Sequence, residues 1–169
     1  MVPFNLLPAE MRLRAFIVGG WAACPALAGD LDVFVLCAKG AAISAIALDT
    51  ERRDIITHLA TSSFEYECED TMIYEHAFNI RKVARVTTGA YPNIHLCLAN
   101  TSNIQAVLAG FDVSTHQVAI DCYGHVIRGK DWTPVHVPPR ALLNTSNTPE
   151  RMARIAARFG HPAPESPLF

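Results

Sequence analysis

The chain has 169 residues, of which 50% are hydrophobic and 18% charged, so its composition favours one globular domain with a sizeable core over a disordered chain. Its net charge of −2 provides no field for a long polyanion and better suits a small substrate that brings its own Mg²⁺. Because no apolar stretch can span a bilayer and the first 20 residues lack the pattern of a secretory signal, we expect a cytoplasmic protein without membrane contacts.

The first half of the chain predicts short strands that alternate with helices. The expected elements are a helix at 6–14, a strand at 15–18, a short helix at 21–27, a strand at 30–36 and a helix at 41–60. The polar run at 49–51 could divide the last of these helices. The acidic segment 65–70 indicates a loop or a solvated strand, and residues 72–88 contain enough β-branched and aromatic side chains for one or two strands.

The second half predicts two further strands, at 94–99 and 117–121, and three helices. The first helix is capped by Thr101 or Ser102 and ends near residue 108, and a short second one surrounds residues 141–143. A third helix, at 149–160, begins with a proline in its first turn and is followed by a Pro-rich tail at 161–169.

The helix at 149–160 is amphipathic. We expect it to pack on the sheet through Met152, Ile155, Ala156 and Phe159, and to leave Arg151, Arg154 and Arg158 outward. Together the elements predict a single domain over residues 1–169 of the α/β (α+β) class, with a mixed central sheet of about five strands flanked by helices.

The stretch that carries chemistry is Gly19-Gly20, nine further residues, and then Asp30-Leu31-Asp32. Two glycines after a strand let the backbone approach a ligand, and the helix start that follows directs N–H groups at phosphate oxygens. Asp30 and Asp32 fall on one face of their strand, so their carboxylates can share a hard cation that bridges triphosphate oxygens.

Each half of this pattern has a common structural explanation when it stands alone. Gly-Gly after a strand is usually a tight turn, and Asp-x-Asp is usually a solvated strand edge. The combination is more specific, because both aspartates open a strongly apolar strand in which unpaired charge is costly. A chance coincidence of the two in an unrelated α/β domain remains an alternative.

Gly19, Gly20, Asp30 and Asp32 resemble the signature of the nucleotidyltransferase superfamily, which is a strand, Gly-Gly or Gly-Ser, a short helix and then Asp-hydrophobic-Asp. Residues 110–121 and 148–160 are similar to poorly characterised viral and phage members. The resemblance implies that Gly19 and Gly20 line a triphosphate, that Asp30 and Asp32 bind Mg²⁺ or Mn²⁺, and that a nucleoside monophosphate passes from an NTP to an acceptor hydroxyl. For a viral chain the expected location is the host cytoplasm.

The resemblance also implies a third carboxylate, on the strand at 94–99, that contacts the metal and takes the proton of the acceptor. The matching residue there is His95, which could serve as a neutral base. Asp112 or Asp121 could supply the carboxylate instead. We favour Asp112, as catalytic residue and metal ligand, because it is expected to open its strand as Asp30 opens its own.

A triphosphate also needs cationic partners. Lys39 is expected to contact the nucleotide, and Arg81, Lys82 and Arg85 are further candidates, with Arg128 and Lys130 behind them. Replacement of the third acid by His95 supports a rival function, in which an inactive member of the fold binds a nucleotide or a protein partner. The sequence leaves open the acceptor (RNA, protein or small molecule), the base and the oligomeric state.

Overall fold

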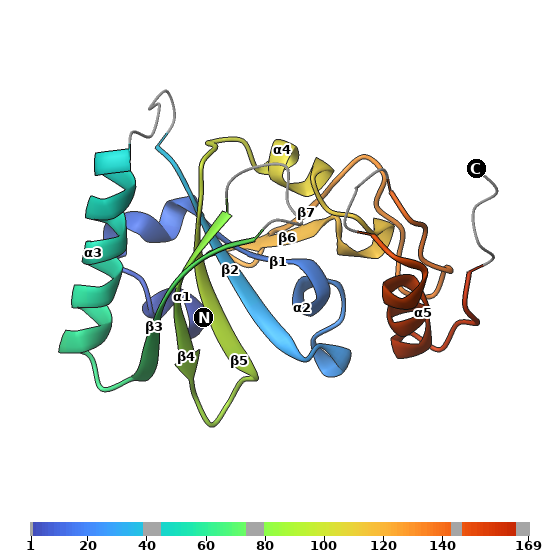
Figure 1. Ribbon diagram of the computed structural model, residues 1–169, viewed down its shortest axis with the longest axis horizontal. Helices are drawn as coiled ribbons and strands as arrows, with labels where there is room; N and C mark the ends of the chain where they lie inside the picture. The colour runs from blue at the N-terminus through green and yellow to red at the C-terminus, as the bar shows by residue number, and fades with distance from the viewer. Residues whose placement is uncertain (1, 39–44, 74–79, 143–146, 165–169) are drawn as a thin grey trace.

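A mixed sheet forms the centre of the computed structural model, which describes residues 2–38, 45–73, 80–142 and 147–164 (Figure 1). The strands among these residues are β1 Ala15–Val18, β2 Asp30–Leu36, β3 Glu65–Ile73, β4 Ile80–Thr87, β5 Asn93–Ala99, β6 Val118–Asp121 and β7 Val126–Arg128. They lie in the order β3-β4-β5-β2-β1-β6-β7. Strands β2 and β5 run parallel, and the other neighbouring pairs are antiparallel.

The predicted α+β class with a mixed sheet is confirmed, but the described residues form seven strands where about five were expected. The acidic segment at 65–70 belongs to the edge strand β3, which tolerates charge because only one side of it pairs. Strand β7 has three residues, too few for an alternating pattern to be recognised in the sequence.

Helices cover both faces of the sheet. The described helical segments are α1 Val2–Asn5, η1 Ala9–Arg14, α2 Gly19–Ala23, η2 Pro25–Leu27, α3 Ala45–Thr61, α4 Ile104–Ala109, η3 Ser114–His116 and α5 Pro149–Arg158, where η denotes a 3-10 helix. No helix in the described ranges has both the length and the hydrophobicity needed to cross a membrane.

Several expected helix boundaries change. Helix α3 runs without a break through residues 49–51, so the predicted division there is wrong. The cap of α4 is Asn103 and not Thr101 or Ser102, because the Asn103 side chain accepts hydrogen bonds from the backbone N–H groups of Gln105 and Ala106. At 6–14 the structure has a 3-10 helix over Ala9–Arg14 instead of a continuous α-helix.

Strand β2 divides the core between the two faces. Leu31, Val33 and Val35 pack on the first face with apolar residues of α1, η1 and α3. Phe34 and Leu36 pack on the second face with residues of β5 and α4. Because side chains alternate along a strand, Asp30 and Asp32 lie on the second face, ahead of Phe34.

Helix α5 lies at the end of the molecule away from α3 (Figure 1). The Thr148 side chain caps it by accepting a hydrogen bond from Arg151 N, directly before the proline expected in its first turn. Its buried Met152 and Ile155 cluster with Val113, which lies outside the seven strands, so α5 docks on this segment and not on the sheet as expected.

The short helix expected near 141–143 is not formed by its described part. Ala141 makes an isolated β-bridge with Val113, and Leu142 N donates a hydrogen bond to Asp112 O at 2.8 Å. These bonds satisfy the backbone in an extended conformation. Residue 143 lies outside the described residues.

Candidate functional site

The antiparallel return from β1 to β2 brings the glycine pair to the aspartates. Val18, the last residue of β1, pairs with Asp32, so Gly19 follows directly beside the start of β2. Both glycines and both aspartates line one cavity of about 470 Å³. The structure therefore brings these four residues together at one end of two adjacent strands.

The two glycines serve different purposes. Gly19 has a φ of 72°, in the left-handed region that disfavours side chains, and this conformation turns the chain directly from β1 into α2. A β-carbon at Gly20 would lie 3.7 Å from His116 Nε2 and 3.8 Å from Arg158 Nη1. The backbone at Gly19 therefore needs glycine for its conformation, whereas Gly20 keeps a corner of the cavity open.

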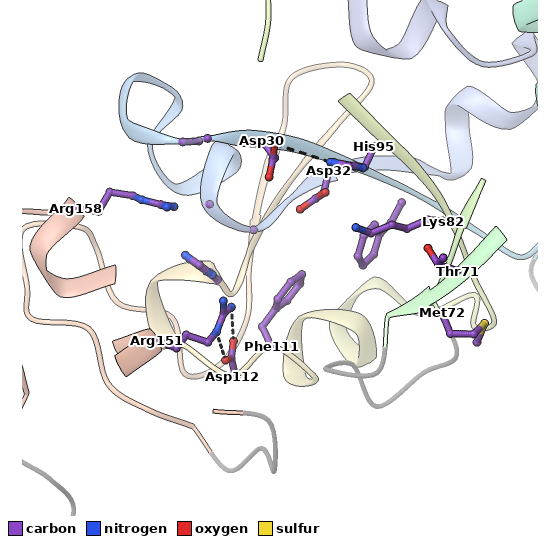
Figure 2. Close-up of a pocket in the computed structure, with 16 residues that line it drawn as sticks. Asp30, Asp32, Thr71, Met72, Lys82, His95, Phe111, Asp112, Arg151 and Arg158 are labelled. Atoms are coloured by element: carbon purple, nitrogen blue, oxygen red, sulfur yellow. Dashed lines mark hydrogen bonds and ion pairs between the residues drawn. The ribbon is translucent and has the colours of Figure 1, made fainter. Parts of the chain in front are cut away.

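Asp30 and Asp32 project from the same face of β2 into the cavity (Figure 2). The Asp30 side chain is exposed, whereas Asp32 is more enclosed. Burial raises the pKa of Asp32 above its usual value; His95 and Lys82 oppose this shift, and the Asp30 charge adds to it. A carboxylate that is costly to ionise and lies beside a second one matches the donor set of a hard divalent cation.

His95 occupies the position expected for it, beside the aspartates. The parallel register of β2 and β5 pairs it with Asp32. Its Nε2 lies 3.9 Å from Asp30 Oδ1, and its Nδ1 lies 3.8 Å from Glu69 Oε2. Both His95 Nδ1 and Glu69 Oε2 are buried without a hydrogen-bond partner.

Glu69 is a site residue that the sequence reasoning missed. It lies on β3, where the register with β4 shifts between Cys68 and Thr71. Such an irregularity changes the direction in which an edge strand presents its side chains. Nothing in an acidic segment such as 65–70 distinguishes one carboxylate from its neighbours, so no sequence signal marks this one.

The Asp112 carboxylate is bound by Arg151 in this structure, so its role as a third metal ligand stays a prediction. Asp112 lines the cavity but is only 3% exposed, and both of its carboxylate oxygens are bound by Arg151, at 2.5 and 3.1 Å. Nor does it open a strand, since β6 begins at Val118. Within the described ranges, no group of three His, Cys, Asp or Glu side chains is close enough to hold a metal ion.

Asp121, the alternative third carboxylate, is not among the residues that line this cavity. Its Oδ1 accepts hydrogen bonds from the backbone N–H groups of Tyr123 and His125, and its Oδ2 lies 3.0 Å from His125 Nδ1. Burial alone would raise the pKa of Asp121, but these hydrogen bonds outweigh it and lower the pKa. Asp121 therefore stabilises a turn.

Among the described residues, three Lys and Arg side chains line the cavity: Lys82, Arg151 and Arg158. Lys82 was among the expected candidates, whereas Arg151 and Arg158 were expected only to point outward; Arg158 is indeed exposed, but both side chains also line the cavity. Because α5 docks on Val113, the side of the helix that carries these two arginines faces the cavity (Figure 2). Their spacing of seven residues, two helical turns, was the available signal that they share a face.

Three of the other expected cations, Arg81, Arg85 and Arg128, have partners elsewhere. Arg81 forms ion pairs with Asp49 and Asp70, and Arg85 forms one with Glu67. Arg128 lies over the ring of Trp132, 4.4 Å from its centroid. Neither Arg128 nor Lys130 lines the cavity, and Lys39 falls outside the described residues.

The cavity thus has chemically different walls. Asp30 and Asp32 extend from β2 on one side, and Arg151 extends from α5 on the other (Figure 2). Phe111 lies between them and stacks on Phe34, with ring centroids 6.2 Å apart and planes inclined by 20°. The arrangement can hold a cation and a multiply charged anion in the same space, next to an aromatic surface.

Comparisons with known proteins assign no family. No family model matches the chain, and no curated protein matches it. A crystal structure of a tRNA nucleotidyltransferase complexed with a primer tRNA and an incoming ATP analogue is similar to this chain, with 21% identity and a TM-score of 0.42. The similarity covers 75% of this chain and 34% of that one, so the chain spans about a third of its length. This likeness is too weak to assign an activity.

Proposed function

We propose that this protein transfers a nucleoside monophosphate from an NTP–Mg²⁺ or NTP–Mn²⁺ complex to an acceptor hydroxyl. The observation that carries the proposal is the cavity in which Asp30 and Asp32, on one face of β2, lie across from Arg151 and beside Lys82. Carboxylates that hold a divalent ion and cations that neutralise phosphate oxygens are the two requirements of phosphoryl and nucleotidyl transfer. The volume of about 470 Å³ also suits a ligand of nucleotide size.

Each residue has a role in this proposal. Asp30 and Asp32 hold the divalent ion, which when bound supplies charge neutralisation at the triphosphate. Lys82 and Arg151 stabilise negative charge on the phosphate oxygens, and Gly19 with Gly20 gives the phosphates a wall free of side chains. The acceptor oxygen forms a bond to the α-phosphorus while the bond to the β-phosphate oxygen breaks, and pyrophosphate leaves.

His95 is our candidate for the group that takes the acceptor's proton. Its Nε2 lies on the Asp30 side and its Nδ1 faces Glu69, so one ring nitrogen can accept the proton while the carboxylate stabilises the imidazolium that forms. This arrangement replaces the third carboxylate that the resemblance to nucleotidyltransferases implies.

A second candidate function is binding without catalysis. It is favoured by one observation, the engagement of both Asp112 oxygens by Arg151, which leaves the aspartate pair without a third carboxylate among the described residues. On this proposal the cavity binds a nucleotide and the protein acts through a partner. Residues 110–121 and 148–160 resemble viral and phage members of this superfamily. For either function, we therefore propose the host cytoplasm as the location.

A transfer assay separates the two functions. Wild-type protein and Asp32→Asn are incubated with each α-labelled NTP, Mg²⁺ or Mn²⁺, and RNA, protein or small-molecule acceptors. A labelled product that requires Asp32 supports catalysis. If no acceptor gives such a product, but ATP with Mn²⁺ raises the melting temperature of the wild type alone, the protein is a binding module. If neither effect occurs, the proposed site is wrong.

A further inference from the structure

Gly20, His116 and Arg158 meet at one corner of the cavity. They come from three separate elements, α2, η3 and α5. A β-carbon built on Gly20 would lie within 4 Å of a nitrogen of each of the other two side chains, 3.7 Å from His116 Nε2 and 3.8 Å from Arg158 Nη1. Because Gly20 has no side chain, the space in front of these nitrogens is open.

His116 is the residue at this corner that needs an explanation. It is 7% exposed, it lines the cavity, and its Nε2 is buried without a hydrogen-bond partner. Buried polar atoms are almost always hydrogen-bonded in folded proteins, so an exception in a cavity wall calls for a specific explanation, such as a bound group, water or ion. The unpartnered nitrogen therefore indicates a group that binds here.

The charges at the corner indicate that this group is an anion. Arg158 is exposed and forms no ion pair with any residue that the structure describes. Burial, followed by the charges of Arg151 and Arg158, lowers the pKa of His116 to about 4, although Asp112 acts in the opposite direction. The ring is therefore neutral at physiological pH and can donate one N–H. The Arg151 guanidinium is bound to Asp112, so at this corner of the cavity Arg158 supplies the positive charge beside His116.

We propose that the corner formed by Gly20, His116 and Arg158 binds a phosphate group, either the terminal phosphate of the nucleotide or a phosphate carried by the acceptor. This inference rests on the proposed function, because it assigns one end of the same cavity to one part of the substrate. A phosphate offers three acceptor oxygens, so it can take hydrogen bonds from a ring nitrogen and a guanidinium at the same time.

The test is a calorimetric titration in which inorganic pyrophosphate is added to the protein in the absence of divalent ions. The variants are Arg158→Ala, His116→Leu and His116→Gln, and the control is Arg154→Ala, which removes the same charge from the exposed side of the same helix. We expect Arg158→Ala and His116→Leu to weaken binding at least about tenfold, and Arg154→Ala to change it by less than about threefold. His116→Gln keeps an N–H donor and is expected to restore part of the affinity.

Gly20→Ala provides an independent variant. A methyl group there makes ordinary contacts of 3.7 and 3.8 Å, so the protein is expected to fold, while the methyl occupies the space in front of the two nitrogens. Pyrophosphate binding is expected to weaken several-fold. The proposal is overturned if pyrophosphate does not bind at millimolar concentration, or if Arg158→Ala and Arg154→Ala bind it equally well.

Failure of this inference is distinguishable from failure of the proposed function. Asp32→Asn is expected to bind metal-free pyrophosphate like the wild type although it cannot transfer nucleotides. If the wild type transfers no nucleotide but still binds pyrophosphate in a way that depends on Arg158, the phosphate site is supported and the proposed activity is rejected. Competition identifies the source of the phosphate. If a nucleoside triphosphate but not a monophosphate displaces pyrophosphate, the site binds the nucleotide. If a monophosphate displaces pyrophosphate preferentially, the site binds the acceptor.

Discussion

Asp112 and Arg151 form a two-pronged ion pair, with Arg151 Nε 2.5 Å from Asp112 Oδ2 and Nη2 3.1 Å from Oδ1. Asp112 is buried, whereas the Arg151 side chain is 34% exposed. The pair joins the first turn of α5 to the segment before η3, and it directs a guanidinium into the cavity (Figure 2). The carboxylate that resembled a metal ligand in the sequence is, in the structure, the residue that positions a cation.

Replacing Asp112 tests this assignment. Asp112→Asn is expected to lower the free energy of unfolding by about 2 kcal/mol, because it leaves the arginine without its buried counter-charge. Urea denaturation measures the loss, and a double-mutant cycle with Arg151→Met isolates the pair. The Mn²⁺ affinity of Asp112→Asn is expected to stay within about threefold of the wild type. A Mn²⁺ affinity at least about tenfold weaker would restore Asp112 as a metal ligand.

Asp32→Asn is expected to stabilise the metal-free protein at neutral pH. The pKa of Asp32 is raised in the folded state, so the native protein binds a proton more tightly than the unfolded chain. Its stability therefore falls as pH rises from the unfolded pKa of this carboxyl through the folded one. A neutral amide removes this loss. The melting temperature is expected to rise by a few degrees, given about 2–4 °C per kcal/mol for a domain of this size.

The same variant is expected to lose stabilisation by Mn²⁺. Asp30→Asn serves as the matched control, because Asp30 is exposed and its replacement should abolish the effect of Mn²⁺ with little change in the metal-free melting temperature. If Mn²⁺ stabilises both variants as it does the wild type, the aspartate pair does not bind the metal.

His116 is expected to make the protein less stable in acid. Its pKa falls from 6.5 to about 4 on folding, so the unfolded chain binds more protons between these values. Stability is fully present above pH 6.5 and is lost as pH falls towards 4, by up to about 3 kcal/mol from this residue. Urea denaturation at a series of pH values is expected to show a shallower pH dependence for His116→Gln.

The control for this prediction is His136→Gln, which removes a histidine from an exposed position. It is expected to keep the pH dependence of the wild type. Equal behaviour of the two variants would mean that His116 does not titrate differently in the folded and unfolded states.

Gly19→Ala and Gly20→Ala are expected to differ in stability. At Gly19 the φ of 72° makes any side chain unfavourable, so alanine is expected to cost about 1–2 kcal/mol. At Gly20 the φ is not positive, the residue lies in α2, and alanine is expected to be neutral or slightly stabilising. Chemical denaturation of both variants measures the difference, and equal costs would contradict the distinction between the two glycines.

Features that depend on neighbouring residues could be predicted from the sequence. The alternation of β2 places Leu31, Val33 and Val35 in one core and the two aspartates on the other face, because side chains of a strand alternate whatever lies beside it. The short connection from Gly19 to Asp30 brings the glycines and the aspartates to the same end of two adjacent strands. For these reasons the aspartate pair and the glycine turn lie where the sequence predicted them.

Features that depend on contacts between distant segments could not be predicted. Arg151 and Asp112 are 39 positions apart, and their pairing follows from the docking of α5 on Val113, a contact that the amphipathic pattern of α5 does not specify. The apolar face of a helix predicts that this face is buried, but it does not predict which part of the protein packs against it. The same limit applies to Glu69, which reaches His95 only through the order of the strands and an irregularity in the edge strand β3. The acidic wall of the cavity, formed by Asp30 and Asp32, is thus a local property of the chain, whereas its cationic wall is a consequence of tertiary packing.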